Sequence, residues 1–148
     1  MKIHYIYYMA VSFYTEGVEM PNINKTSVRN WIKKVTELHS KRLGAVSYIF
    51  CDDNKLLEVT QNYLKHDYFT DIITFDYTEG DKISGDLFIS LDTVRTNAEQ
   101  FAQDYETELH RVIIHGILHL CGINDKGPGE REIMEAEENA ALEVLKSL

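Results

Sequence analysis

One apolar helix in the second half of the chain constrains the fold most. The stretch from about Glu106 to Cys121 is predicted to be helical, and Gly122 is expected to end it. Glycine suits that position because it readily adopts the positive φ found just after a helix C-terminus. The middle of this helix carries large apolar side chains, namely Val112, Ile113, Ile114, Leu118 and Leu120. A helix this apolar must be buried by other elements of the domain.

The remaining elements can supply that cover. Apolar periodicity predicts four strands, at about 11–14, 46–51, 72–75 and 86–90. It predicts further helices at about 24–43, 52–63, 92–103 and 130–148, the first of them ending at Gly44. This order indicates an α+β (mixed α/β) fold, a single domain over 1–148 with a mixed sheet of about four strands packed by helices. A chain of 148 residues has the length of one domain and can bury its own core.

Several features indicate a cytoplasmic protein without a membrane partner. Two cysteines, Cys51 and Cys121, are too few for a disulfide framework. No apolar run approaches the roughly 18 residues that span a bilayer. The N-terminus lacks the apolar segment and cleavage site of a signal peptide. Met9 offers a second start, which would make residues 1–8 an upstream extension.

The apolar helix also carries a pattern of metal ligands. His115 and His119 are four residues apart, so their imidazoles lie one turn apart on one face. Gly122 breaks the helix, which lets the chain fold back and bring Asp125 beside the two histidines. This H-x3-H-x2-G-x2-D pattern resembles the metzincin zinc-binding motif. Two imidazoles and one carboxylate leave a coordination position open, as in catalytic zinc sites, so we predict one Zn²⁺ or another divalent ion.

The residue after the first histidine limits the chemistry. Zinc proteases of the H-E-x-x-H type carry their general-base glutamate there, and this chain has Gly116. Peptide hydrolysis by that mechanism is therefore not expected. A metal can still activate water or neutralise charge on a phosphoryl oxygen, which makes a phosphodiester the more suitable substrate.

The sequence around the histidines resembles the signature of the YbeY family of bacterial endoribonucleases and rRNA maturation factors. Residues 115–122, H-G-I-L-H-L-C-G, are similar to the family pattern H-G-x-L-H-L-x-G. Residues 70–75, T-D-I-I-T-F, resemble its T-D-V-L-S-F strand, and residues 85–90, G-D-L-F-I-S, resemble its G-D-I-x-I-S strand. The resemblance covers roughly residues 11–148.

This resemblance implies an activity and its partners. The expected protein is a zinc-dependent, single-strand-specific endoribonuclease that acts in maturation of the 16S rRNA 3′ end and in ribosome quality control. Its implied partners are rRNA and the ribosomal subunits, without DNA. His115, His119 and Asp125 would be the catalytic residues, acting through the metal that they hold.

Two positions depart from the family pattern. The third ligand is usually a histidine and is Asp125 here, which is still able to complete a metal site. An arginine that contacts phosphate in the family is replaced by Leu64. Lys65, His66 and Arg111 are the candidates for contacting the substrate in its place. Asp71 and Asp86 flank predicted strands and are either partners that orient a ligand imidazole or ordinary turn carboxylates.

Charge is segregated along the chain. The first predicted helix and the residues just after it carry Lys25, Arg29, Lys33, Lys34, Lys41 and Arg42. The last helix is acidic, with its apolar stripe expected at Ile133, Ala136, Ala140 or Ala141, Val144 and Leu145. A net charge of -9 excludes a passive RNA coat. The basic helix is either a solvated face or a patch that contacts RNA or the ribosome.

Two other functions remain open from the sequence. One is a metallohydrolase of a substrate other than RNA. The other is a non-catalytic ribosome-assembly factor whose metal is structural, a hypothesis that the loss of the arginine at Leu64 favours.

Overall fold

The computed structural model describes residues 10–64 and 70–148. The strands are β1 (Val11–Thr15), β2 (Arg42–Cys51), β3 (Ile72–Asp76) and β4 (Lys82–Ser90). The helices are α1 (Lys25–Leu38), α2 (Asp53–Val59), a π-helical turn η2 (Thr60–Leu64), α3 (Leu91–Gln100), α4 (Tyr105–Leu120) and α5 (Glu130–Ser147). The predicted α+β domain with a four-stranded mixed sheet is confirmed.

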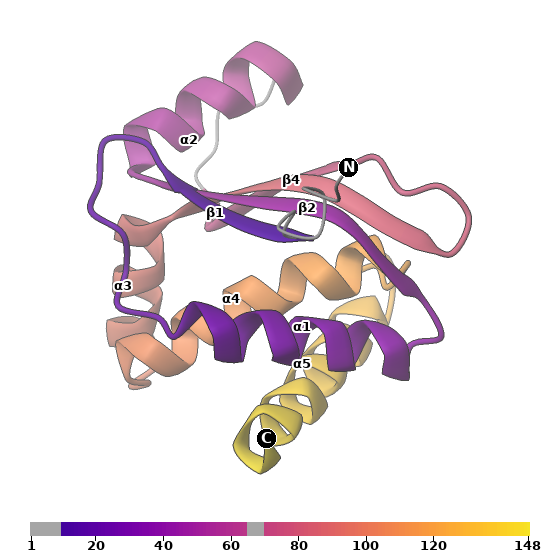
Figure 1. The fold of residues 1–148 in the computed structure, drawn as a ribbon. Helices are drawn as coiled ribbons and strands as arrows, with labels where there is room; N and C mark the ends of the chain where they lie inside the picture. The colour runs from indigo at the N-terminus through magenta and orange to yellow at the C-terminus, as the bar shows by residue number, and fades with distance from the viewer. Residues whose placement is uncertain (1–9, 65–69) are drawn as a thin grey trace, which may run out of the picture.

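The sheet has the strand order β1-β2-β4-β3. β1, β2 and β4 run parallel, and β3 lies at the edge, antiparallel to β4. In Figure 1, α1, α4 and α5 lie below the sheet and α2 lies above it. The sheet is therefore covered on both faces, as a sheet with parallel strands requires.

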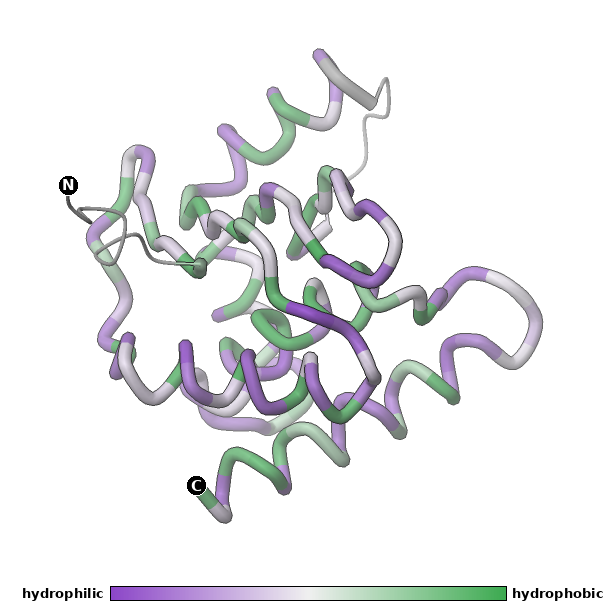
Figure 2. The backbone as a smooth tube through the Cα atoms, turned by 45° about the vertical axis from the view of Figure 1, so that its right-hand side comes forward, coloured by the Kyte–Doolittle hydropathy of each residue, from purple (hydrophilic) through white to green (hydrophobic). Residues whose placement is uncertain are grey.

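The main core lies between the sheet and the layer of α1 and α4. Val46, Tyr48 and Phe50 alternate along β2 toward that layer and are almost fully buried. α4 supplies the apolar residues that the sequence predicted to be buried, and they are buried. A smaller cluster of Cys51, Leu56, Val59 and Ile73 packs under α2. Figure 2 shows hydrophobic and hydrophilic residues alternating along α1 and α5, as expected for helices with one buried face.

The first helix is shorter than predicted. It ends at Leu38 rather than near Leu43, because Ser40 adopts a left-handed conformation with φ 60°. Leu43 instead belongs to β2 and pairs with Ile83. Gly44, expected to end the helix, lies inside this strand. A Cβ there would come within 2.4 Å of the Ile83 carbonyl oxygen, so glycine permits the close approach of the two strands.

The last helix, α5, buries a different set of residues from the apolar stripe that was predicted. Met134, Glu138 and Ala141 are the buried residues of α5, whereas Ile133 is 56% exposed and Ala136 is exposed. A buried glutamate replaces an expected apolar position, because Arg111 and His115 of α4 bind its carboxylate. The stripe prediction was therefore wrong at its N-terminal half.

Some of the basic residues between Lys25 and Arg42 are bound to other residues of the chain, and others are exposed to solvent. The Nε of Arg29 donates to the Val11 carbonyl at 2.9 Å, and the guanidinium lies over the Phe13 ring. Arg42 forms an ion pair with Asp81. Lys33 and Lys34 are exposed on α1, so a patch that contacts RNA or the ribosome stays a prediction for these residues. None of the helices in the described part of the chain is both long enough and apolar enough to span a membrane.

Candidate active site

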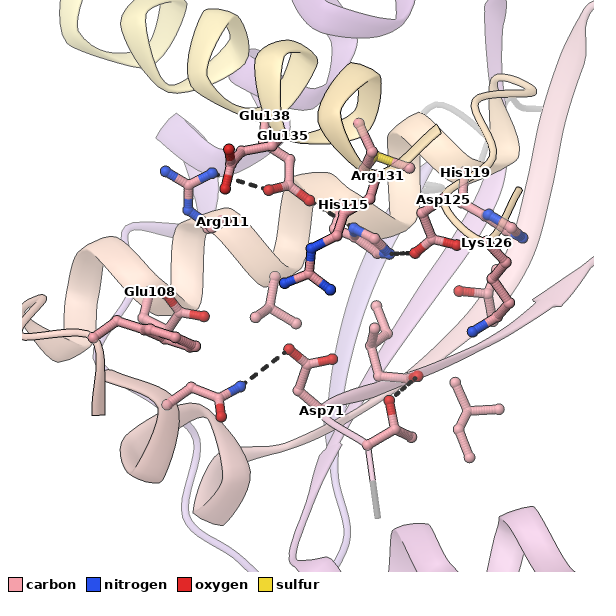
Figure 3. Close-up of a pocket in the computed structure, with 18 of the residues that line it drawn as sticks. Asp71, Glu108, Arg111, His115, His119, Asp125, Lys126, Arg131, Glu135 and Glu138 are labelled. Carbon is pink, nitrogen blue, oxygen red and sulfur yellow. Dashed lines mark hydrogen bonds and ion pairs between the residues drawn. The ribbon is translucent and has the colours of Figure 1, made fainter. Parts of the chain in front are cut away.

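A cavity of about 710 Å³ opens between α4, α5, α3 and the start of β3. The predicted metal ligands His115, His119 and Asp125 line it, and so does Arg111, a candidate for substrate contact. Figure 3 shows the polar side chains that surround it. They also include Thr70, Asp71, Asn97, Glu108, Lys126, Arg131, Glu135 and Glu138. Lys65 and His66, the other candidates for substrate contact, lie outside the described residues.

The end of α4 places the third predicted ligand beside the first. Gly122 has φ 100°, and its N–H donates to the His119 carbonyl at 3.0 Å. The N–H of Ile123 donates to the Leu118 carbonyl at 3.1 Å, which completes a Schellman turn. The chain reverses there, and Oδ2 of Asp125 comes to lie 3.3 Å from Nε2 of His115. The glycine break and the return of Asp125 were both expected from the sequence.

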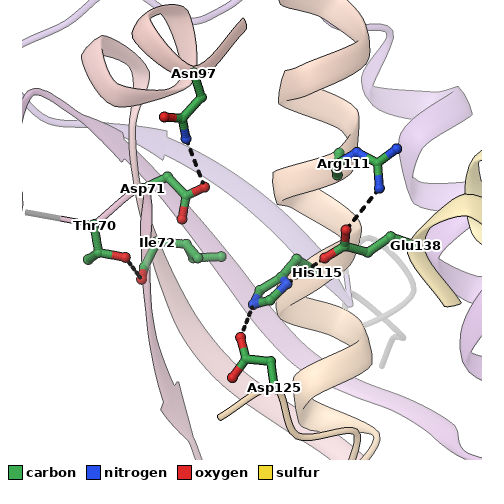
Figure 4. A network of polar contacts seen from close by, with 8 residues as sticks. All are labelled: Thr70, Asp71, Ile72, Asn97, Arg111, His115, Asp125 and Glu138. Carbon is green, nitrogen blue, oxygen red and sulfur yellow. Dashed lines mark hydrogen bonds and ion pairs between the residues drawn. The ribbon is translucent and has the colours of Figure 1, made fainter. Parts of the chain in front are cut away.

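His115 is held from its other ring nitrogen as well. Nδ1 lies 2.6 Å from Oε2 of Glu138, a carboxylate that is only 8% exposed. Because a carboxylate accepts, Nδ1 carries the proton and Nε2 faces Asp125. Figure 4 shows the imidazole between these two carboxylates. A carboxylate that fixes the tautomer and direction of a metal-binding histidine is the usual partner at such sites.

Arg111 completes this chain of contacts. Its Nη1 donates to Oε1 of Glu138 at 2.9 Å, and its Nη2 donates to the Asn139 side-chain oxygen at 2.7 Å. The sequence proposed Arg111 as a substrate contact, which stays a prediction, and its guanidinium binds Glu138 and Asn139 of α5. Arg111 therefore holds Glu138 against His115.

The carboxylates of the cavity shape the charge at His115. Burial disfavours its imidazolium, but Glu138, Asp71 and Asp125 outweigh that effect and raise the pKa of His115 above its ordinary value. The negative charge of these carboxylates favours a cation at the imidazole. That cation is either a proton or a metal ion that takes the place of the proton.

Two further carboxyl groups line the same cavity. Burial raises the pKa of Asp71. Burial also raises the pKa of Glu108, helped by the nearby charge of Asp71. Asp71 accepts a long hydrogen bond of 3.4 Å from Asn97 and none from either histidine. A buried carboxyl group of this kind can take or give a proton during a reaction. Asp86 lies on β4 and accepts a hydrogen bond from Tyr77, outside the cavity.

The residues present fit a metal ion in part. Two ligands of one tetrahedral zinc lie about 3.4 Å apart, given zinc–ligand distances of about 2.1 Å. The 3.3 Å between Nε2 of His115 and Oδ2 of Asp125 matches that spacing. His119 lines the same cavity, but no hydrogen bond or ion pair joins its imidazole to another described residue. Across residues 10–64 and 70–148, no three His, Cys, Asp or Glu side chains are gathered into a metal-binding group.

Gly116 faces the sheet rather than the cavity. A Cβ at this position would lie 3.0 Å from side-chain carbons of both Ile72 and Leu87. The glycine lets α4 pack closely on β3 and β4. A glutamate here would point into the apolar core, so this site has no place for the general base of H-E-x-x-H proteases.

Sequence reasoning missed Glu138 and Arg131. Glu138 is one of several acids in α5, and its neighbour Glu137 instead pairs with His39 at 3.6 Å. The available signal was its spacing of four residues from Met134, which places both on the buried face of α5. Arg131, which also lines the cavity, had no such signal, because its place there depends on where α5 crosses α4.

An α+β domain whose cavity combines a carboxylate-held histidine, further acids and cations has the make-up of a small hydrolytic enzyme. A family model described as Endoribonuclease YbeY matches residues 14–146. The chain belongs to this YbeY family. A relative from Phocaeicola vulgatus named Endoribonuclease YbeY is 70% identical, over 91% of this chain and 98% of its own. A relative of the same name from Porphyromonas gingivalis is 52% identical, over 92% of this chain and 90% of its own.

A solved structure shows the same fold. The solution structure of a Thermotoga maritima protein superposes with a TM-score of 0.61 at 24% identity. The match covers 93% of this chain and 92% of that one.

Proposed function

We propose that this protein is a metal-dependent endoribonuclease that cleaves single-stranded RNA, with His115, His119 and Asp125 holding the metal ion. The observation that carries this function is the His115 imidazole, fixed by Glu138 on one nitrogen and facing Asp125 with the other. The family model and the relatives named Endoribonuclease YbeY support RNA as the substrate. When bound, a divalent cation such as Zn²⁺ supplies positive charge where a phosphodiester transition state accumulates negative charge.

The cellular role that we propose is maturation of the 16S rRNA 3′ end and ribosome quality control in the cytoplasm. Ribosomal subunits are then the partners, and DNA is not a substrate. The resemblance of residues 70–75, 85–90 and 115–122 to the family signatures supports this role. It is tested by complementation of a strain that lacks the gene, with the length of the rRNA 3′ end as the measurement.

Metal content measured together with cleavage tests the enzymatic function. Gently purified protein is expected to hold about one equivalent of a divalent metal. Chelation should abolish cleavage of an unstructured RNA, and adding back Zn²⁺ or another divalent ion should restore it. A DNA oligonucleotide of the same sequence is the matched control and should stay intact, because it lacks the 2′-hydroxyl.

Two results would contradict the metal-dependent enzyme. Less than about half an equivalent of metal would argue against the site. Cleavage that survives complete chelation would remove the metal from the reaction. Turnover of a peptide or a small molecule without RNA cleavage would favour a metallohydrolase of another substrate.

Phe101 is a candidate for the residue that makes the enzyme prefer single-stranded RNA. This side chain is 58% exposed and lines the cavity. An unpaired base can stack on such a ring, whereas a base inside a duplex cannot. Replacing Phe101 by alanine is expected to lower kcat/KM on unstructured RNA about tenfold, since one stacked base contributes about 1–3 kcal/mol.

The matched control for this prediction is Tyr14→Ala. Tyr14 is an aromatic residue of similar exposure, 55%, on β1 outside the cavity. Its replacement should leave kcat/KM unchanged, and Phe101→Tyr should restore most of the loss. Equal effects of Phe101→Ala and Tyr14→Ala would show that Phe101 does not stack on the substrate.

A further inference from the structure

We propose that Arg131, assisted by Lys126, binds a phosphate group of the RNA strand inside the cavity. This inference rests on the proposed function, because it names how the same cavity holds its substrate. It assigns a role in binding to two residues that the sequence did not single out.

Arg131 extends from the first turn of α5 into the cavity. Its side chain is exposed and lines the cavity together with Asp71 and His115. Figure 3 shows its guanidinium pointing toward the middle of the cavity, between these two side chains in that view. No hydrogen bond or ion pair joins the guanidinium of Arg131 to another residue of the described part of the chain. Its donors are therefore directed into the space that a substrate would fill.

The other arginines of the chain are all occupied. Arg29 donates to Val11 and lies over Phe13. Arg42 pairs with Asp81, and Arg95 lies over the Tyr105 ring. Arg111, which also lines the cavity, is held by Glu138 and Asn139. Arg131 thus differs from them in presenting its whole donor fork to the cavity.

The loop before α5 binds the acid that precedes Arg131 in the sequence. The N–H of Gly127 donates to Oε1 of Glu130 at 2.6 Å, which turns that carboxylate back onto the loop. Gly129 has φ 77° and begins α5 without a side-chain cap. This turn brings Lys126, a second exposed cation, to the same cavity. Lys126 also forms no ion pair with another described residue.

The chemistry of these two cations fits phosphate. A guanidinium presents two parallel N–H groups that match two phosphate oxygens, and an ammonium adds a point charge. Several carboxylates line the same cavity, among them Asp71, Glu108 and Asp125. A polyanion can enter such a cavity only where positive charge offsets that repulsion. Arg131 and Lys126 supply this charge from the chain itself.

Binding of a fluorescent single-stranded RNA oligonucleotide to chelated, non-cleaving protein tests this assignment. Arg131→Ala is expected to weaken Kd about tenfold, as for loss of a hydrogen-bonded charge. It should also reduce the slope of log Kd against log salt by about 0.7, the value for one phosphate of a single strand. Lys126→Ala should lower the slope in the same direction. Arg131→Lys should keep the slope and recover part of the affinity, because the charge remains and the fork is lost.

Lys146→Ala is the matched control. It removes one exposed positive charge at the other end of the same helix, where Lys146 pairs with Glu143. Its Kd and salt slope should equal those of the parent protein. A parental slope in Arg131→Ala, or an equal change in Lys146→Ala, would overturn the assignment, and so would a parent protein that binds no RNA. If the metal-loaded parent fails to cleave RNA while the Arg131-dependent slope is found, the enzymatic proposal fails and the phosphate site stands.

Discussion

Replacing His115 by alanine is expected to release the metal and to lower RNA cleavage about a thousandfold or more. The physical reason is that a bound cation contributes several kcal/mol to the transition state, and each 1.4 kcal/mol changes the rate about tenfold. His115 contacts both Asp125 and Glu138, one carboxylate at each of its ring nitrogens. Metal content after dialysis and single-turnover cleavage measure the two effects.

The control for this variant is His39→Ala. His39 is a histidine outside the cavity that pairs with Glu137, so its loss should leave metal content and cleavage unchanged. Thermal unfolding of both variants separates loss of the site from loss of the fold. A His115→Ala protein that retains metal and activity would contradict the proposed ligand set. One that still restores rRNA processing in cells would favour a non-catalytic assembly factor.

Replacing Glu138 by glutamine is expected to weaken metal affinity about 10–100-fold, the range found when a partner of a metal-binding histidine is removed. The amide keeps the size of the side chain but loses the charge that holds the Nδ1 proton of His115 and the guanidinium of Arg111. His115 then loses its fixed tautomer and direction. Competition with a chelator of known affinity measures the change without using activity.

Glu137→Gln is the neighbouring control. Glu137 lies one position earlier on α5 and contacts His39 rather than His115. The expected result is a parental metal affinity for Glu137→Gln and a weakened one for Glu138→Gln. Glu138→Asp keeps the charge and should recover part of the affinity. Equal affinities in Glu137→Gln and Glu138→Gln would show that Glu138 does not position His115.

Local patterns were enough to predict most of the secondary structure. The buried α4, its end at Gly122 and the return of Asp125 follow from apolar spacing and from the freedom of glycine at positive φ. Two helices predicted to begin at about 24 and 52 have Asn24 and Asp52 as their N-caps. The boundary between α1 and β2 was not predictable, because pairing of Leu43 with Ile83 joins residues far apart in the chain.

The site likewise combines features that local sequence predicts with features that depend on distant parts of the chain. His115, His119 and Asp125 could be named from the sequence because the spacing of ligands along one helix and its turn is a local property. Their closure into a metal-binding group stays a prediction, since His119 lines the cavity without joining the other two. Arg111 could be named as a cavity residue, but its partner Glu138 could not, because α5 contributes it from 27 residues further along the chain.

The amino-acid sequence therefore determined the helix that carries the histidines, the turn that returns Asp125 and the family of the protein. The crossing of α5 over α4 determined which acid holds His115 and which arginine is left free for a substrate. Glu138 is one of several glutamates on α5, and only the rotation of that helix separates it from the others. That rotation is fixed by packing of residues such as Met134 and Ala141 against distant elements, a non-local balance that no short stretch of sequence encodes.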